Sequence, residues 1–471
     1  MSTYDLLLKN GYVVDPGSKL EGRYDVAIAG GKIEKIAEHI DGTKADEIID
    51  AGGHCVLPGI IDLHTHMSGD FGGRYAHKMV AEVGVTTVLD MAGPIDSSVS
   101  MAANYGTGVN VACIHMVRGN VTIEGEDPSR EAIHAFLDKA LLAGALGCKI
   151  LGGHYPLTAA ATARIIEVAN ERQAYVGFHA GTKDTGSNID GFLEAVNLAA
   201  GHALHIAHIN SYCRGQVRDP LAEANQAVAA LIDNPNITSE SYISPFNGTS
   251  AQCAGGIPES NVTKTCLKAG GYAADEPGME QAILKGWAFV NIPEGGRVVL
   301  KAGPEARDFW RANATAANVS FPINPADSRL RLATAKRPDG SFAVGAISTD
   351  GGGIPRNSII DMGLSLVKLN ALTLREFAVK TSLNPAASLG LKSKGHLGLG
   401  MDADITVVDL ETQKAVMSFV NGRPVMYKGL VVGRGAQFIT TAAGKQAIAD
   451  AGITPLVVDL AESDFYTRAR K

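Results

Sequence analysis

From Gly59 onward the chain repeats one pattern, in which a short apolar segment is followed by a turn and then by a helical stretch. Strands that alternate with helices form a parallel sheet, and eight such strands close into a barrel. The segments are apolar enough to be buried on both faces, as barrel strands are. We therefore predict an α/β fold, a (β/α)8 TIM-like barrel, with strands at residues 60–63, 86–90, 110–116, 147–151, 174–179, 203–209, 237–243 and 346–350.

The two ends of the chain differ from the barrel and consist of short strands joined by turns, for example at Gly30 and Gly31. Because the two ends share this character, we expect them to build one small β-sandwich domain from residues 1–57 and 388–435, beside a barrel of residues 58–387. Its strands are expected at residues 5–14, 25–29, 32–37, 47–50, 54–57, 404–409, 415–420 and 423–427.

Two further segments lie outside this plan. Residues 250–333 are too many for one loop between strands. We expect an inserted cap of helices and loops over the site, since long loops on such scaffolds often carry specificity; the alternative is a lengthened crossover without a functional role. Residues 436–471 are expected to form a C-terminal helix and a tail.

The composition excludes several classes of function. The formal net charge of -7 gives no basic footprint for nucleic acid. No apolar run approaches the roughly 20 residues that a membrane span requires, and the first residues do not resemble a signal peptide. The six cysteines include no CxxC pair, which excludes a zinc ribbon and, without an export signal, indicates reduced thiols. We expect a cytoplasmic protein that acts on a small-molecule substrate, with no nucleic-acid or membrane partner.

Side chains with metal-binding chemistry stand at five of the eight predicted strand ends. Chemistry in such barrels collects at the carboxyl ends of the strands. His64 and His66 are two residues apart on the first strand, so their side chains point the same way. Lone histidines usually have structural roles, but here other strand ends carry matching groups that suit Zn²⁺ or a similar ion. The candidate ligands are His64, His66, Lys149, His179, His208 and Asp350.

Lys149 needs separate treatment, because an ammonium group repels a cation. A neutral amine that adds CO₂ becomes an anionic carbamate, whose two oxygens can bridge two metal ions. Burial favours this reaction by disfavouring the ammonium form. The alternatives are a lysine paired with a carboxylate and a lysine that binds substrate.

Several segments together resemble the amidohydrolase superfamily, in the branch of dihydroorotases, hydantoinases and D-aminoacylases. The resemblance spans nearly the whole chain and is weakest over residues 250–333. A cysteine ligand of the D-aminoacylases has no counterpart here, since no cysteine lies between Cys55 and Cys113. The segments that carry the resemblance are residues 56–66, 84–88, 204–211, 348–351, 384–386 and 394–404.

The resemblance implies two divalent metal ions, expected to be Zn²⁺, in a binuclear centre. One ion, the more buried, would be held by His64, His66 and Asp350, with Asp350 also the general base. The second would be held by His179 and His208, and a CO₂-derived carbamate on Lys149 would bridge the two. His205, on the same strand as His208, is expected to be packed away from the site.

The implied activity is hydrolysis of an amide C–N bond, in a cyclic amide or ureide or in an N-acyl amino acid. A hydroxide bridging two metals is a nucleophile at neutral pH, since metal binding lowers the pKa of water to about 7. Alternatives are a deaminase of the same superfamily, which typically needs one metal and no carboxylated lysine, and a non-catalytic scaffold related to hydantoinases. A homo-oligomer is the family expectation.

Substrate contacts are expected from the loops that follow the strands. An arginine there can hold a substrate carboxylate through two parallel hydrogen bonds. For each residue the alternative is a solvated or structural loop position. The candidates are Arg74, Tyr155, Tyr212, Arg214 and Asn247.

Overall fold

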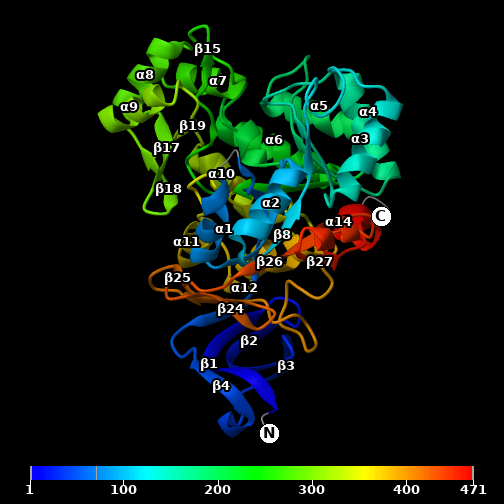
Figure 1. The fold of residues 1–471 in the computed structure, drawn as a ribbon, viewed down its shortest axis with the longest axis vertical. Helices are drawn as coiled ribbons and strands as arrows, with labels where there is room; N and C mark the ends of the chain where they lie inside the picture. Colours follow the sequence, from blue (N-terminus) through cyan, green and yellow to red (C-terminus); the bar gives the residue numbers. More distant parts are fainter. Residues whose placement is uncertain (1–2, 70–71, 469–471) are drawn as a thin grey trace.

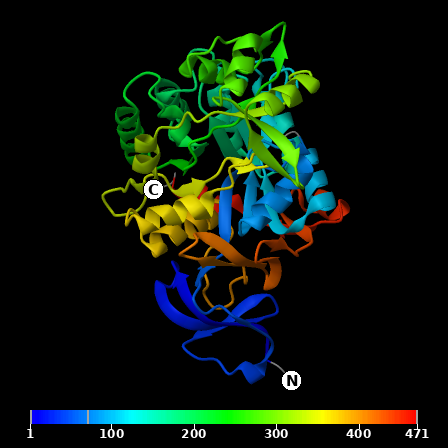
Figure 2. The same cartoon turned by 90° about the vertical axis from the view of Figure 1, so that its left-hand side faces the viewer.

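The structure is a computed structural model that describes residues 3–69 and 72–468. A small β-rich part holding the N-terminus lies at the bottom of Figure 1, the barrel lies in the middle, and a cap lies at the top left. Figure 2 shows the same stacking from the side, with the orange strands of residues 405–431 between the N-terminal strands and the barrel. No helix in the described ranges is long and apolar enough to cross a membrane.

Eight parallel strands form the barrel, as predicted from the sequence. Two of them are interrupted and therefore count as pairs of shorter strands. At one interruption the N–H of Ile114 donates to the carbonyl of Asp90 at 3.0 Å, and at the other the N–H of Asp350 donates to the carbonyl of His64 at 2.8 Å. These bonds join the two sheets into one ring. Its strands are β6 (Ile60–His66), β7 (Val85–Asp90), β8 (Thr107–Cys113) with β9 (His115–Val117), β10 (Gly147–Leu151), β11 (Tyr175–His179), β12 (Leu204–Ile206), β13 (Ile237–Tyr242), and β20 (Ala346–Ser348) with β21 (Gly351–Gly352).

Helices cover the outside of the ring because the strands are apolar on their outer faces as well as their inner ones. Leu137, Ile165 and Phe192, each from a different helix, are fully buried in one continuous core with the strands. The helices are α1 (Gly73–Glu82), α2 (Ile95–Tyr105), α3 (Arg130–Leu142), α4 (Ala159–Glu171), α5 (Ile189–Ala199), α6 (Pro220–Asp233), α10 (Ala326–Thr334) and α11 (Ile359–Lys368), followed by α12 (Leu374–Ala378) and α13 (Asn384–Ser388).

Strands from both ends of the chain share one nine-stranded sheet. They meet where β5 runs antiparallel to β22, with Thr406 opposite Leu57. Val26 and Phe419, from opposite ends of the chain, are buried in one apolar core. The exact domain boundaries stay a prediction, and residues 1 and 2 lie outside the described ranges. The strands are β1 (Tyr4–Asp15), β2 (Leu20–Ala29), β3 (Lys32–Ala37), β4 (Ala45–Asp50), β5 (Cys55–Pro58), β22 (Ile405–Asp409), β23 (Lys414–Val420), β24 (Arg423–Tyr427) and β25 (Leu430–Val431).

The segment expected to be a cap of helices and loops also contains a four-stranded antiparallel sheet. The sequence signal for it was Gly295-Gly296, which forms the two-residue turn of a hairpin with both φ angles positive. Trp310 is fully buried in a core that belongs to the cap. The elements are β14 (Thr249–Ser250), α7 (Asn261–Ala269), α8 (Glu276–Leu284), β17 (Phe289–Glu294), β18 (Arg297–Lys301), α9 (Pro304–Ala312) and β19 (Asn318–Ser320).

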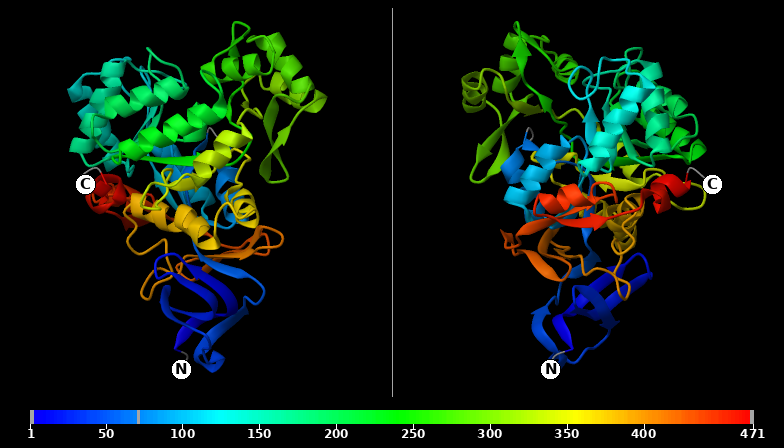
Figure 3. Two further views of the ribbon diagram at one scale, coloured as in Figure 1. Left: turned by 180° about the vertical axis from the view of Figure 1, so that it is seen from behind. Right: turned by 45° about the vertical axis from the view of Figure 1, so that its right-hand side comes forward.

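The C-terminal segment is more than the expected helix and tail. Strand β26 (Gly435–Thr440) pairs with β8, and β27 (Thr454–Val457) pairs with β26, on either side of the short helix α14 (Lys445–Asp450). The interrupted third strand of the ring consists of β8 and then β9. Because β10 pairs with only β9 of these two, the edge of β8 stays free, and β26 pairs with it. Phe438 and Ile439 are fully buried there. Figure 3 shows this segment against the side of the barrel; residues 469–471 lie outside the described ranges.

Candidate metal centre

The first and last strands of the ring bring three of the predicted ligands together. Oδ1 of Asp350 lies 2.8 Å from Nε2 of His66 and 3.3 Å from Nε2 of His64. One ligand atom from each of the three residues lies within 4.8 Å of the others. The arrangement can therefore hold one divalent ion between two imidazoles and a carboxylate.

The other predicted ligands face the same space from neighbouring strands. The rings of His179 and His208 are 4.4 Å apart, and the ring of His208 stacks on that of His64 at 5.0 Å. Together with Lys149, these side chains line one cavity of about 310 Å³ at the carboxyl ends of the strands. The structure thus brings all six predicted ligands to one mouth of the barrel.

The chemistry of these side chains fits bound cations. Lys149 is only 1% exposed, and its Nζ has no hydrogen-bond partner among the described residues. Burial lowers the pKa of Lys149 to about 7, against the opposing pull of Glu240 and Asp350. Burial also holds the pKa of His179 and His208 well below the ordinary value, so both rings are neutral. Neutral imidazoles are the form that binds metal, and a neutral amine is the form that reacts with CO₂.

Two of the six residues have a left-handed backbone. His208 has a φ of 34° and Asp350 a φ of 51°, values that are uncommon for residues other than glycine. Each of them stands where a barrel strand stops. Such strained backbone is held only where the surrounding structure fixes it, and it clusters at functional sites.

Sequence reasoning missed the carboxylate that orients the first histidine. Glu240 on β13 is fully buried, and its Oε1 lies 2.7 Å from Nδ1 of His64. It also accepts hydrogen bonds from the backbone N–H of His208 and the hydroxyl of Ser348. A carboxylate on the far nitrogen of a ligating histidine fixes the tautomer and the ring orientation. The only signal for it was a charged residue in the middle of a predicted barrel strand.

His179 is held from behind in a similar way. Its Nε2 lies 2.8 Å from Oγ of Ser187, which leaves Nδ1 as the nitrogen that can bind a metal. A Cβ atom on Gly153 would lie only 2.0 Å from the same Nε2. Glycine at this position therefore lets the chain pass close behind the ring.

Arg356 is a second residue that sequence reasoning missed, and no motif pointed to it. Its guanidinium is 6% exposed and lies 2.5 Å from Oδ2 of Asp350, while its Nε donates to the Asp350 carbonyl at 2.6 Å. Burial alone would raise the pKa of the Asp350 carboxyl, but Arg356 and His64 outweigh burial and hold that pKa well below its usual value. Asp350 is therefore ionised.

The predicted substrate contacts divide into two groups. Tyr155, Arg214 and Asn247 line the cavity, although the Asn247 amide also bonds the backbone of Phe321. Tyr212 is 1% exposed and packs behind His179 and His208, accepting a hydrogen bond from a backbone N–H.

Arg74, like Tyr212, is not among the described residues that line the cavity, and it also lies away from the histidines. It is exposed on helix α1, and its guanidinium lies 4.7 Å above the ring of Tyr75. The loop before it includes residues 70 and 71, which lie outside the described ranges.

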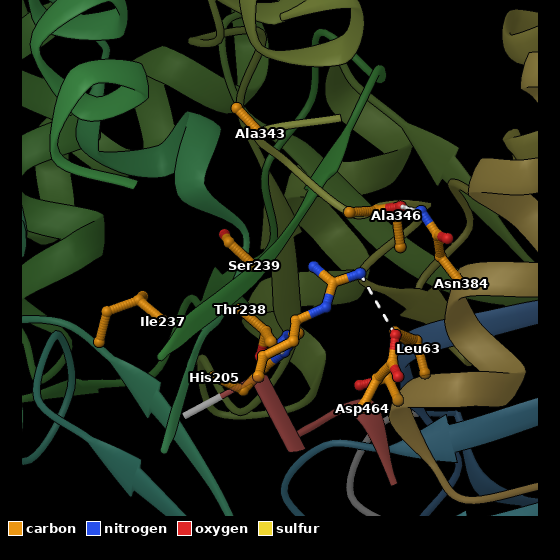
Figure 4. Close-up of a pocket in the computed structure, with 12 residues that line it drawn as sticks. Leu63, His205, Ile237, Thr238, Ser239, Ala343, Ala346, Asn384 and Asp464 are labelled. Carbon is orange, nitrogen blue, oxygen red and sulfur yellow. Dashed lines mark hydrogen bonds and ion pairs between the residues drawn. The ribbon is translucent and has the colours of Figure 1, made fainter. Parts of the chain in front are cut away.

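A much smaller cavity of about 20 Å³ lies below the metal centre, towards the amino ends of β13 and β20. Figure 4 shows His205 and Ser239 among its lining residues, together with Asp464 of the short helix α15 (Asp464–Thr467). Nδ1 of His205 lies 3.1 Å from the Thr238 hydroxyl, and its Nε2 lies 4.0 Å from Glu240. His205 is thus packed in the barrel beneath the ligands, in a space with room for about one water molecule.

Comparison with known proteins adds the following. The profile of the Amidohydrolase family matches residues 325–435. A dihydroorotase of Pelotomaculum thermopropionicum is 26% identical over 94% of this chain and 99% of its own length. A dihydroorotase of Aquifex aeolicus is 41% identical, but over 20% of this chain and 24% of its own length. The chain thus spans about a quarter of the Aquifex relative, but almost the whole of the Pelotomaculum relative.

Among solved structures, an N-acyl-D-glutamate deacylase from Bordetella bronchiseptica, crystallised with zinc and a phosphonate inhibitor, is similar with a TM-score of 0.67. The match covers 92% of this chain and 99% of that one, at 17% identity. At that identity the likeness establishes the fold, and it extends over the barrel and the sheet beside it.

Proposed function

We propose that this chain, which belongs to the amidohydrolase superfamily, is a metal-dependent hydrolase that cleaves an amide C–N bond. One observation supports this most strongly. Four histidines, an ionised aspartate and a buried lysine with a pKa near neutrality line a single cavity at the carboxyl ends of the strands. A scaffold that had lost catalysis would not be expected to keep all six.

The residues present fit two ions of the zinc type. His64, His66 and Asp350 would hold one ion, and His179 and His208 the other, with a carbamate on Lys149 between them. Such ions supply a nucleophile at neutral pH and polarise the scissile carbonyl.

The chain's own groups account for proton transfer. Asp350 is ionised, so it accepts the proton of the attacking nucleophile and then delivers it to the departing nitrogen. Arg356 holds the second carboxylate oxygen of Asp350 and keeps Oδ1 directed towards the two histidines. The products are a carboxylate and an amine, or a ring-opened acid when the amide is cyclic.

Metal analysis combined with a substrate screen tests this function. The purified protein is analysed for bound metal and assayed with hydantoins, dihydropyrimidines and N-acyl amino acids of both hands. Near two ions per chain with release of a carboxylate supports the proposal. Near one ion with release of ammonia from an aminated ring would instead indicate a deaminase. No bound metal and no turnover would indicate a scaffold.

A further inference from the structure

Two further cavities, of about 370 Å³ and 690 Å³, share lining residues with the cavity at the metal centre. Arg214, on the loop after β12, lines all three. Val262 of helix α7 lines the first two, and Thr265 of the same helix lines the outer two. The three cavities therefore adjoin one another at Arg214, between the barrel loops and the cap that stands at the top left of Figure 1. We call this row of cavities the path.

The walls of this path are strongly biased towards positive charge. Among the described residues that line the three cavities, Asp350 is the only carboxylate, and it is already paired with Arg356. The lining cations other than the ligand set are Arg118, Arg214, Lys268 and Lys183, of which Lys183 is paired with Glu126 outside the cavities. The chain as a whole carries a net charge of -7, so this lining contrasts with the rest of the molecule. A cleft lined by one sign of charge concentrates ligands of the opposite sign.

Arg214 is held in place without being neutralised. Its Nε donates to Oδ1 of Asn324 at 2.7 Å, and its Nη2 lies 3.0 Å from the Ser211 hydroxyl and 3.1 Å from that of Tyr242. None of these partners carries a charge, and no carboxylate of the described residues lies within 4.0 Å of the guanidinium. Nη1 keeps both of its hydrogens free of the described residues, so this fixed guanidinium can donate to a carboxylate and attract its charge.

The cap contributes directly to this arrangement. Asn324, which holds Nε of Arg214, lies just beyond the cap sheet, and Lys268 stands at the end of helix α7 on the outermost cavity. Lys268 is exposed and has no carboxylate partner among the described residues. The inserted segment therefore both positions the inner cation and supplies an outer one.

We propose that the substrate is an elongated polycarboxylate amide, with one carboxylate bound by Arg214 and an acidic extension lying in the outer cavities towards Lys268. This inference rests on the proposed function for the position of the scissile amide. It assigns substrate selection to Arg214 and to the cap.

Binding of two matched peptides tests the proposal without requiring turnover. The full metal-loaded protein is titrated calorimetrically with N-acetyl-triglutamate and with N-acetyl-triglutamine, which has the same length but no side-chain charge. The acidic peptide is expected to bind at least about tenfold more tightly, with an affinity that falls as salt is raised. Equal binding of the two peptides would overturn the proposal.

Variants locate the binding site. R214Q is expected to weaken binding of the acidic peptide about tenfold and K268Q by a few-fold. The control K285Q removes an exposed lysine of the same cap that does not line the path, and it should change nothing. Because Lys268 is exposed, K268Q should fold normally, and weaker binding in this variant would not result from unfolding. Unchanged affinity for the acidic peptide in both R214Q and K268Q would contradict the proposal.

Turnover separates this inference from the proposed function. If the enzyme hydrolyses neutral amides with the same kcat/KM as acidic ones, the substrate assignment is wrong while the hydrolase function stands. If the acidic peptide binds through Arg214 but no amide is hydrolysed, the hydrolase function is wrong while the anion-binding path stands.

Discussion

Oε1 of Glu240 lies 2.7 Å from Nδ1 of His64, and both side chains are buried. Glu240 stands on the seventh strand of the ring and His64 on the first, so the contact joins two strands that are separated by the eighth. Because Nδ1 is occupied by this carboxylate, Nε2 is the nitrogen directed to Asp350 and to any bound ion. The contact makes Glu240 the residue that positions His64.

Replacing Glu240 by glutamine should weaken metal binding. The amide keeps the size of the side chain but loses the charge that fixes the His64 tautomer, and such partners are worth about 10–100-fold in metal affinity or activity. Competition with a chelator measures the affinity. The control S348A removes only a neutral partner of Glu240 and should have a smaller effect. Wild-type metal affinity in E240Q would show that Glu240 does not position the ligand.

Replacing Asp350 by alanine should abolish turnover while the protein retains most of its metal. Loss of a general base costs about 10²–10⁴ in rate, and the remaining ligands still offer four histidines. Steady-state kinetics and metal analysis on the same preparation test this. D450A, which removes an exposed carboxylate on helix α14, should behave as wild type. Full activity in D350A would rule out the proposed proton transfer.

Lys149 should make the stability of the metal-free protein depend on pH. Its pKa is about 7 in the folded chain and 10.5 ordinarily, so between these values the unfolded chain binds a proton that the folded chain does not. The free energy of unfolding therefore rises with pH from about 7 to 10.5, by up to about 1.4 kcal/mol per pH unit. K149M should remove the contribution of Lys149 and leave that of other buried groups, as urea unfolding at several pH values would show.

Lys380 provides the matched control for that measurement. It is fully buried outside the site, bonds the carbonyl of Val344, and also has a pKa of about 7 because of burial. K380M should change the pH dependence of stability in the same way but leave metal binding intact, whereas K149M should lose metal. If K149M keeps two ions per chain, Lys149 does not bridge the metals.

Replacing Gly153 by alanine should displace His179. The added Cβ would lie 2.0 Å from Nε2 of that ring, too close for the ring to remain where it is. We expect loss of about one ion per chain by metal analysis. The control G345A adds a Cβ that comes no closer than 3.7 Å to its neighbours and should keep both ions. A full complement of metal in G153A would show that His179 is not a ligand.

The barrel could be predicted because strand and helix patterns are local. Strand β10, for example, lies at residues 147–151 as the sequence predicted, since an apolar segment between turns has few alternatives. Two strands of the cap were missed because they are only two and three residues long, β14 and β19. The hairpin of β17 and β18 was missed because only Gly295 and Gly296 mark it. The strand β26 was missed because it forms only where β8 leaves an open edge.

The sequence by itself determined which groups stand at the strand ends, because in a parallel barrel the chain direction places every such residue on one rim. The proposed ligands follow from that rule: His64, His66, Lys149, His179, His208 and Asp350. Only the tertiary structure decided what surrounds those groups. Glu240 contacts His64 from two strands away, Arg356 turns back onto Asp350, and Arg214 meets the cap at Asn324. These contacts join residues far apart in sequence or separated by an irregular loop, so no local periodicity encodes them.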